Sequence, residues 1–388
     1  MTGASPSPAG GEYEAAIEDF TEALKLDPDM VAAWMLRGRA MYSSASRVTS
    51  VDENFISIGT RITKSPTDPA VGITVAEERK AVYDRAVSNF TQAIRLDPGN
   101  ARAYKDRAGV YRNIGDYDRA IADLTHALRL DPNFAEAYHS RGVVYSNKRE
   151  YDKAIADLNQ AIRLAPDKAS SYHNRGEAYY SKKEYDKAIA DLTHAIQLDP
   201  DEAAISYNER GNCYNSKGEY DKAIADFTQT IRLEPDYDTA YNNRGIAYRR
   251  KGESDKAIAD YTQAIHINPN GDLAFLNRAY VYKTEGEYDK AIADYTQVIH
   301  INPNNAGTYV DRGRVYDTKG EYDKAIADYN QALRLNPRYA NAYCDRGIAY
   351  YRKKDYARAR ADFEKALEIN PNHANARKWL EYLQEDKG

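Results

Sequence analysis

The stretch EYDKAIADYTQVIHINPN, at residues 287–304, decides the fold because near-copies of it recur along the chain. Residues 321–338 read EYDKAIADYNQALRLNPR, and residues 150–167 read EYDKAIADLNQAIRLAPD. From Pro98 to Pro371 the prolines that end these copies are spaced by 34 residues, with a single spacing of 35. A fixed period of this length predicts a solenoid, in which one small unit of structure is stacked many times.

One repeat, at residues 101–134, contains two separate helical patterns. Apolar residues recur at i, i+4 and i+7 in each half, which places them on one face of a helix. Gly115 lies between the halves and suits the left-handed conformation that ends many helices, and Pro132 ends the second helix. The repeat therefore predicts two antiparallel helices that must stack on neighbours to bury their apolar faces. The two apolar stripes are Tyr104, Ala108 and Tyr111, and Ala120, Leu124 and Ala127.

This pattern resembles the tetratricopeptide repeat family over residues 11–386, apart from one insertion. The resemblance implies an all-α fold, an α-solenoid whose antiparallel helix pairs form a right-handed superhelix. It also implies that the first helix of each pair lines a concave groove that binds protein partners. The residues that carry the resemblance are Tyr138, Gly142 and Tyr145 in a first helix, and Ala154, Leu158, Ala161 and Pro166 in a second.

Nine complete pairs are expected, with an incomplete repeat before them and a capping helix after them. The incomplete repeat has a second helix without its first, so its apolar face lacks a partner within the repeat. Thr74 and Glu77 have the spacing of a capping box, which predicts a helix start near Val75. The expected segments are a disordered segment (1–10), the array (11–388), its half repeat (11–30), a repeat (31–100) with an inserted loop at about 44–73 and a strand-like stretch NFISIGTRIT (54–63), repeats (101–373) and the cap (374–386).

An arginine precedes the small residue of every first helix, and an aspartate recurs in nearly every second helix. Both positions lie about 60° from the buried stripe on the same flank, at about 100° per residue. We therefore expect an Arg–Asp pair in each helix pair, with a structural role. The arginines are Arg37, Arg107, Arg141, Arg175, Arg210, Arg244, Arg278, Arg312 and Arg346, and their partners are Asn89, Asp123, Asp157, Asp191, Asp226, Asp260, Asp294, Asp328 and Asp362.

The sequence contains no motif for catalysis, cofactor binding or metal binding. His139 and His173 occupy the same position of successive repeats, but two ligands without a third do not make a metal site, and we interpret both as solvated. The net charge of −5 argues against nucleic-acid binding. Cys213 and Cys344 lie several repeats apart, too far for a disulfide in an extended array. The chain is therefore expected to be neither an enzyme nor a nucleic-acid-binding protein.

No apolar run approaches the ~20 residues that a membrane span needs. The chain starts with MTGASPSPAG, which has no apolar signal core. The sequence favours the cytoplasm without deciding the compartment, because any segment upstream of Met1 would carry the signal.

Two sets of first-helix residues are candidates for a peptide-binding groove. An asparagine amide both donates to and accepts from a peptide backbone, so a row of asparagines would hold an extended peptide. A second set forms an apolar strip beside Lys283 that would take a hydrophobic anchor. The alternatives are polar residues on a wet helix face for the first set and packing between neighbouring first helices for the second. The candidates are Asn174, Asn208, Asn242, Asn243 and Asn277 in the row, and Leu273, Leu276, Tyr280, Val310 and Arg314 in and beside the strip.

The function expected from these patterns is a scaffold that binds an extended peptide or a partner helix along the concave groove. One alternative is an assembly module that self-associates through the incomplete N-terminal repeat. Another is the regulatory arm of a larger protein. The sequence does not identify the partner.

Overall fold

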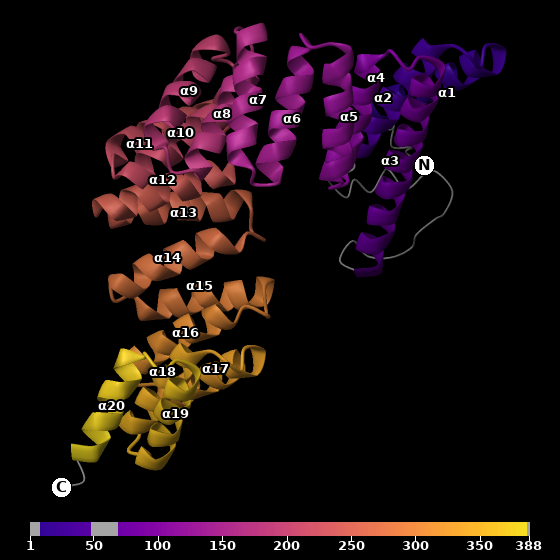
Figure 1. Ribbon diagram of the computed structural model, residues 1–388. Coiled ribbons are helices and arrows are strands. Elements are labelled where there is room, and N and C mark those ends of the chain that lie inside the picture. Colours follow the sequence, from indigo (N-terminus) through magenta and orange to yellow (C-terminus); the bar gives the residue numbers. More distant parts are fainter. Residues whose placement is uncertain (1–7, 48–68, 386–388) are drawn as a thin grey trace, which may run out of the picture. The chain divides into compact units, whose positions relative to one another are not determined.

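The computed structural model describes residues 8–47 and 69–385 (Figure 1). Within these ranges all the regular structure is α-helical, in twenty helices, and consecutive helices pack in pairs, which confirms the predicted α-solenoid. None of the helices in the described ranges combines the length and apolarity needed to cross a bilayer.

The chain divides into two compact units, Met1–Pro200 and Asp201–Gly388, which we call the first and second unit. The division falls where the spacing between prolines lengthens from 34 to 35 residues, between Pro200 and Pro235. In the first unit, α1 packs on α2, and four pairs follow, α2 with α3 through α8 with α9. The helices are α1 (Pro8–Leu26), α2 (Val31–Arg47), α3 (Pro69–Leu96), α4 (Ala101–Asn113), α5 (Tyr117–Leu130), α6 (Ala135–Asn147), α7 (Tyr151–Leu164), α8 (Ala169–Ser181) and α9 (Tyr185–Leu198).

The second unit contains five pairs, α10 with α11 through α18 with α19, and a last helix that packs on α19. Throughout, the even-numbered member of a pair is its first helix and the odd-numbered member its second helix. The helices are α10 (Ala204–Lys217), α11 (Tyr220–Leu233), α12 (Asp238–Lys251), α13 (Ser254–Ile267), α14 (Asp272–Thr284), α15 (Tyr288–Ile301), α16 (Ala306–Thr318), α17 (Tyr322–Leu335), α18 (Ala340–Arg352), α19 (Tyr356–Ile369) and α20 (Ala374–Glu385).

Several segment bounds differ from the sequence-based expectations. Helix α1 begins at Pro8, inside the segment 1–10 that was expected to be disordered, and the rest of that segment lies outside the described residues. Helix α3 begins at Pro69 rather than near Val75, and proline is favoured at the first position of a helix. Helical residues therefore extend into the segment 44–73 from both ends, to Arg47 in α2 and from Pro69 in α3. The rest of this segment, including its strand-like stretch, lies outside the described residues.

Small residues let the two helices of a pair approach closely. A β-carbon on Gly142 would lie 2.8 Å from Leu158 Cγ, and one on Gly245 would lie 2.7 Å from the ring of Tyr261. Leu158 and Tyr261 are both fully buried. The first helix thus packs its backbone directly on a large side chain of the second helix, which fixes the two helices against each other.

The predicted Arg–Asp pairs form in all eight repeats that contain both residues. In each pair the arginine Nε and Nη2 donate to the two oxygens of one carboxylate, as Arg141 does to Asp157 at 2.7 and 2.8 Å. In the remaining repeat, Arg37 Nε donates to Asn89 Oδ1 at 2.7 Å. We call this series the Arg–Asp ladder. Its members are Arg107–Asp123, Arg141–Asp157, Arg175–Asp191, Arg210–Asp226, Arg244–Asp260, Arg278–Asp294, Arg312–Asp328 and Arg346–Asp362.

The same arginines also reach the preceding repeat. Arg141 Nη1 donates to Thr125 Oγ1 at 3.1 Å, and Arg244 Nη1 donates to Thr228 Oγ1 at 3.1 Å. Each of these arginines therefore joins its own second helix to the second helix before it. The other bridges of this kind are Arg37 to Thr21, Arg107 to Thr91, Arg175 to Asn159, Arg278 to Thr262, Arg312 to Thr296 and Arg346 to Asn330.

Removal of one ladder partner is expected to destabilise the protein strongly. Asp260→Ala leaves the Arg244 guanidinium largely buried without its carboxylate, at an expected cost of about 3 kcal/mol in the free energy of unfolding. Arg244→Met combined with Asp260→Leu should recover part of this loss, because no buried charge is then left alone. The measurement is urea unfolding followed by circular dichroism, with the exposed Asp255→Ala as the matched control. An Asp260→Ala variant as stable as this control would contradict a structural role for the ladder.

Candidate functional site

The fifth residue of each first helix in the second unit is at least partly buried. This differs from the prediction that residues at this position face an open groove. The exposed fractions of Asn208, Asn242 and Val310 are 2%, 9% and 0%. Val310 belongs to a core cluster that also contains Ala342 of the next first helix. These three residues therefore pack between neighbouring first helices, because the helices stack closely enough to cover this position.

The asparagine row of the second unit is bonded to itself from repeat to repeat. Asn243 Nδ2 donates to Asn208 Oδ1 at 3.1 Å, and Asn277 Nδ2 donates to Asn242 Oδ1 at 2.9 Å. Asn208 Nδ2 also donates to Glu209 Oε1 at 3.2 Å. Since each amide nitrogen has two hydrogens, the half-buried Asn243 and Asn277 keep one donor and their carbonyl oxygen for other contacts.

The apolar strip of the second unit is exposed in only part of its predicted extent. Leu273 and Tyr280 are 64% and 47% exposed. Leu276 is half-buried and packs in a cluster with Tyr295. Leu273, Asn277 and Tyr280 are spaced at i, i+4 and i+7 on one side of α14, and we call this set the α14 face.

Charged side chains beside the α14 face are arranged differently from the prediction. Arg314 is bound within the protein, since its Nε donates to Asp345 at 2.8 Å and its Nη1 to Asp311 at 3.4 Å. Burial raises the pKa of both carboxyl groups, although Arg314 acts to lower each of them. Arg249 of α12 instead lies next to the face, 5.0 Å from the centre of the Tyr280 ring. Arg249 could not be predicted as part of this face from the sequence, because a contact between neighbouring repeats leaves no signal in the periodicity of one helix.

Asn174 of the first unit contacts a histidine of the preceding repeat. Its Nδ2 lies 3.3 Å from His139 Nε2, and His139 Nδ1 lies 3.0 Å from Ser171 Oγ. His139 is half-buried between α6 and α8, where a solvated side chain was predicted. Burial lowers the pKa of His139, and Arg112 and His173 lower it further.

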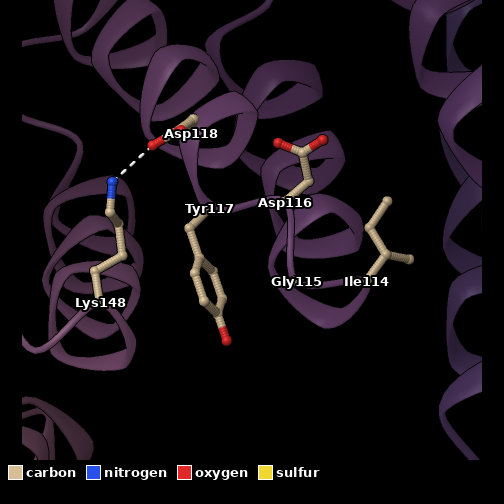
Figure 2. A pocket seen from close by; sticks show the side chains of 6 residues that line it. All are labelled: Ile114, Gly115, Asp116, Tyr117, Asp118 and Lys148. Carbon is tan, nitrogen blue, oxygen red and sulfur yellow. Dashed lines mark hydrogen bonds and ion pairs between the residues drawn. The ribbon is translucent and has the colours of Figure 1, made fainter.

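A hollow in the first unit is a general feature of the repeat, because an equivalent hollow occurs at the same turn of another repeat. Figure 2 shows Tyr117 and Asp118 at the start of α5, with Lys148, which directly follows α6, bound to Asp118 at 2.6 Å. The second unit has an equivalent hollow, where Lys353 pairs with Asp323. Because the hollow recurs at equivalent turns, it carries no information about a particular ligand. The first is lined by Ile114, Gly115, Asp116, Tyr117, Asp118 and Lys148, and the second by Gly320, Glu321, Tyr322, Asp323, Lys324 and Lys353.

Family models of one repeat type match most of this chain. A model described as "TPR repeat" matches residues 108–149, 211–252 and 313–354. Models described as "Tetratricopeptide repeat" match residues 239–270, 273–305 and 340–373, residues 142–207, residues 89–122 and 294–327, and residues 9–49.

Solved structures are similar to parts of the chain, whereas no curated protein matches it. YrrB, a TPR protein with an unusual peptide-binding site, is 27% identical over 48% of this chain and 95% of its own, with a TM-score of 0.41. MamA is 32% identical over 44% of this chain and 92% of its own, with a TM-score of 0.40. A tetratricopeptide repeat protein from Parabacteroides merdae is 22% identical over 64% of this chain and 98% of its own, with a TM-score of 0.48.

The lowered pKa of His139 predicts a loss of stability in mild acid. Below its ordinary pKa of 6.5, the histidine of the unfolded chain takes up a proton before the buried one does. Stability from the neutral His139 is therefore complete above about pH 6.5 and is lost as the pH falls toward the lower folded pKa. The groups around the ring are Arg112 and His173, which favour the neutral form, and Glu136, which opposes them.

The measurement is the urea midpoint at pH 7.5 and pH 5.5 for the wild type and His139→Gln. The variant should lose less stability between the two values. His266→Gln, at an exposed histidine of the second unit, is the matched control and should follow the wild type. An identical pH dependence in all three proteins would show that His139 titrates normally.

Proposed function

Because this chain belongs to the tetratricopeptide repeat family, we propose that it is a non-enzymatic scaffold that holds an extended peptide or a partner helix against its first helices. Repeats of this family imply a scaffold for protein–protein interaction. The finer proposal concerns which surface receives the partner and by which contacts. It places the partner of the second unit on the α14 face.

The observation that carries the proposal is a contrast between positions inside the repeat. The eighth residue of each first helix packs on its second helix and is always Gly or Ala. The ninth residue, one step along, differs in size and charge between repeats of the second unit. In a scaffold, the eighth position must be uniform so that the helices pack, whereas the ninth position can vary and so specify a partner. The ninth residues of the second unit are Asn212, Ile246, Tyr280, Arg314 and Ile348.

The α14 face has the chemistry of a peptide anchor site. Leu273 and Tyr280 offer exposed apolar surface, and between them Asn277 keeps one amide donor and its carbonyl oxygen. Arg249, beside Tyr280, supplies a positive charge at the edge. An apolar side chain of the partner would lie on Leu273 and Tyr280 while its backbone bonds to the Asn277 amide.

A second candidate function, self-association through α1, is favoured by the incomplete burial of that helix. Ala16 and Phe20 are half-buried, whereas Ala120 and Leu124, at the same positions of a complete repeat, are almost fully buried. Ile17 is half-buried beside them. A second copy of this chain presents the same apolar stripe and would cover it.

A photo-crosslinking amino acid at Leu273 should capture a partner that the same group on a second helix does not. The matched control position is Gln297, which is exposed on α15. Crosslinking in the source lysate, followed by mass spectrometry, should give one protein enriched from position 273 and reduced by Tyr280→Ala. The α14 face would be excluded as the binding surface if both positions captured the same protein in equal amounts. It would also be excluded if Tyr280→Ala did not reduce the amount captured from position 273.

Self-association predicts a molar mass that rises with concentration and depends on α1. Light scattering of the wild type should show growth from 43.8 kDa toward twice that value. Ile17→Asp should abolish the growth, because it puts a charge into the shared apolar stripe. Ile114→Asp, at an exposed apolar residue of the first unit, is the matched control. A wild type that stays at one molar mass at all concentrations would reject this function.

A further inference from the structure

The first unit contains a cavity of about 180 Å³ between three successive first helices, α2, α4 and α6. Its floor is apolar and its walls are polar. This volume exceeds what a single water molecule needs. The floor consists of Phe90, Ala108, Leu124 and Val144, and the walls of Arg39, Tyr42, Lys105, Asp106, Gly109, Arg112 and Ser140.

The cavity exists because Gly109 has no side chain. Gly109 is the ninth residue of α4, and the next two first helices of this unit carry Val143 and Glu177 at that position. A β-carbon on Gly109 would meet only the Tyr42 side chain, at 3.6 Å from its hydroxyl, which is ordinary contact. Neither a close approach of helices nor a left-handed backbone requires glycine here. Its effect is to leave space above the apolar floor.

The walls of the cavity carry more positive than negative charge. Asp106 pairs with both Arg39 and Lys105, at 2.6 and 2.8 Å. In the part of the chain that the structure describes, Arg112 forms no ion pair. Its hydrogen-bonding neighbours are the neutral Tyr42 hydroxyl and Asn113 Oδ1 at 3.4 Å, and His139, whose pKa Arg112 helps to lower, is neutral at pH 7. Three cations therefore face one anion, which leaves room for one or two further negative charges.

Two other arginines on first helices, in the second unit, are paired with aspartates instead. Arg314, a ninth residue, is matched by Asp345 at 2.8 Å, and Arg352 is matched by Asp317 at 2.5 Å. Arginines on first helices thus do not by themselves create a positive site. Arg249, which has in α12 the position of Arg112 in α4, likewise forms no ion pair among the described residues, but it lies against the Tyr280 ring. What distinguishes the Gly109 cavity is that its excess positive charge borders open space.

We propose that the Gly109 cavity binds the side chain of a glutamate in an extended peptide. The carboxylate bonds to Arg112 and Lys105, which are charge-assisted donors. The methylene groups of the side chain lie on Leu124 and Val144, and the Ser140 and Tyr42 hydroxyls border the carboxylate. This inference rests on the proposed scaffold function, and it adds the chemical class of residue that the first unit reads.

The test uses the full chain labelled with ¹⁵N and the peptide acetyl-Gly-Ser-Glu-Ser-Gly-amide, whose blocked ends leave one carboxylate. The Gly109 amide signal, assigned by its absence in Gly109→Val, should shift and saturate as peptide is added. The same peptide with glutamine in place of glutamate should bind at least roughly tenfold more weakly, since it lacks the charge. Arg112→Gln should weaken binding of the glutamate peptide by a similar factor.

Gly109→Val fills the cavity with the side chain that the next repeat already carries at this position, so the fold should persist and binding should be lost. Arg163→Gln removes an exposed arginine from α7 and should bind as the wild type does. Equal binding of the glutamate and glutamine peptides would overturn the proposal, and so would unchanged binding by Gly109→Val. Tighter binding of a peptide whose only carboxylate is its free C-terminus would overturn the assignment to a side chain. Failure here leaves the crosslinking result at Leu273 unaffected, because that position lies in the other unit.

Discussion

The arginine that precedes the small residue of each first helix is the contact on which the repeat geometry depends. In the complete bridges, one guanidinium holds the carboxylate of its own second helix with two nitrogens and reaches the preceding second helix with the third. It therefore sets the geometry within a pair and the stacking of one pair on the next. Burial raises the pKa of Asp226 in spite of Arg210, whereas Asp226 raises the pKa of Arg210 in spite of burial. Because one arginine engages two second helices, the ladder fixes the register of one helix pair on the next.

Because the packing positions are fixed, only a few positions of each first helix are available for function. The structure shows that these positions differ in how far neighbouring helices cover them. The fifth residue is covered by the neighbouring first helix, as in Asn208 and Val310. The sixth residue is half-buried, and in Asn277 it donates one hydrogen bond to the preceding repeat. The ninth has the most freedom, and it is also the position at which Tyr280 and Gly109 produce the two surfaces described above. Binding chemistry therefore concentrates where the stacking of helices makes no demand.

The two surfaces differ in kind because the same position is filled in one unit and empty in the other. Tyr280 adds an exposed ring to the α14 face, beside an arginine that lies against it. Gly109 removes a side chain and exposes an apolar floor under an excess of positive charge. One surface suits an apolar anchor and the other an acidic side chain.

The sequence by itself determined the period, the two helices of each repeat, most helix ends and the Arg–Asp pairing. These follow from local rules, since the direction of a side chain around its own helix depends only on its place in that helix. What the sequence did not determine is which polar and apolar side chains remain open, because that depends on the neighbouring helix. Thus Asn208, Asn242 and Val310 were expected to face the groove but are buried, and Arg314 is held by Asp345. The Gly109 cavity is bounded by three first helices and the two second helices beneath them, so only the tertiary structure brings its walls together.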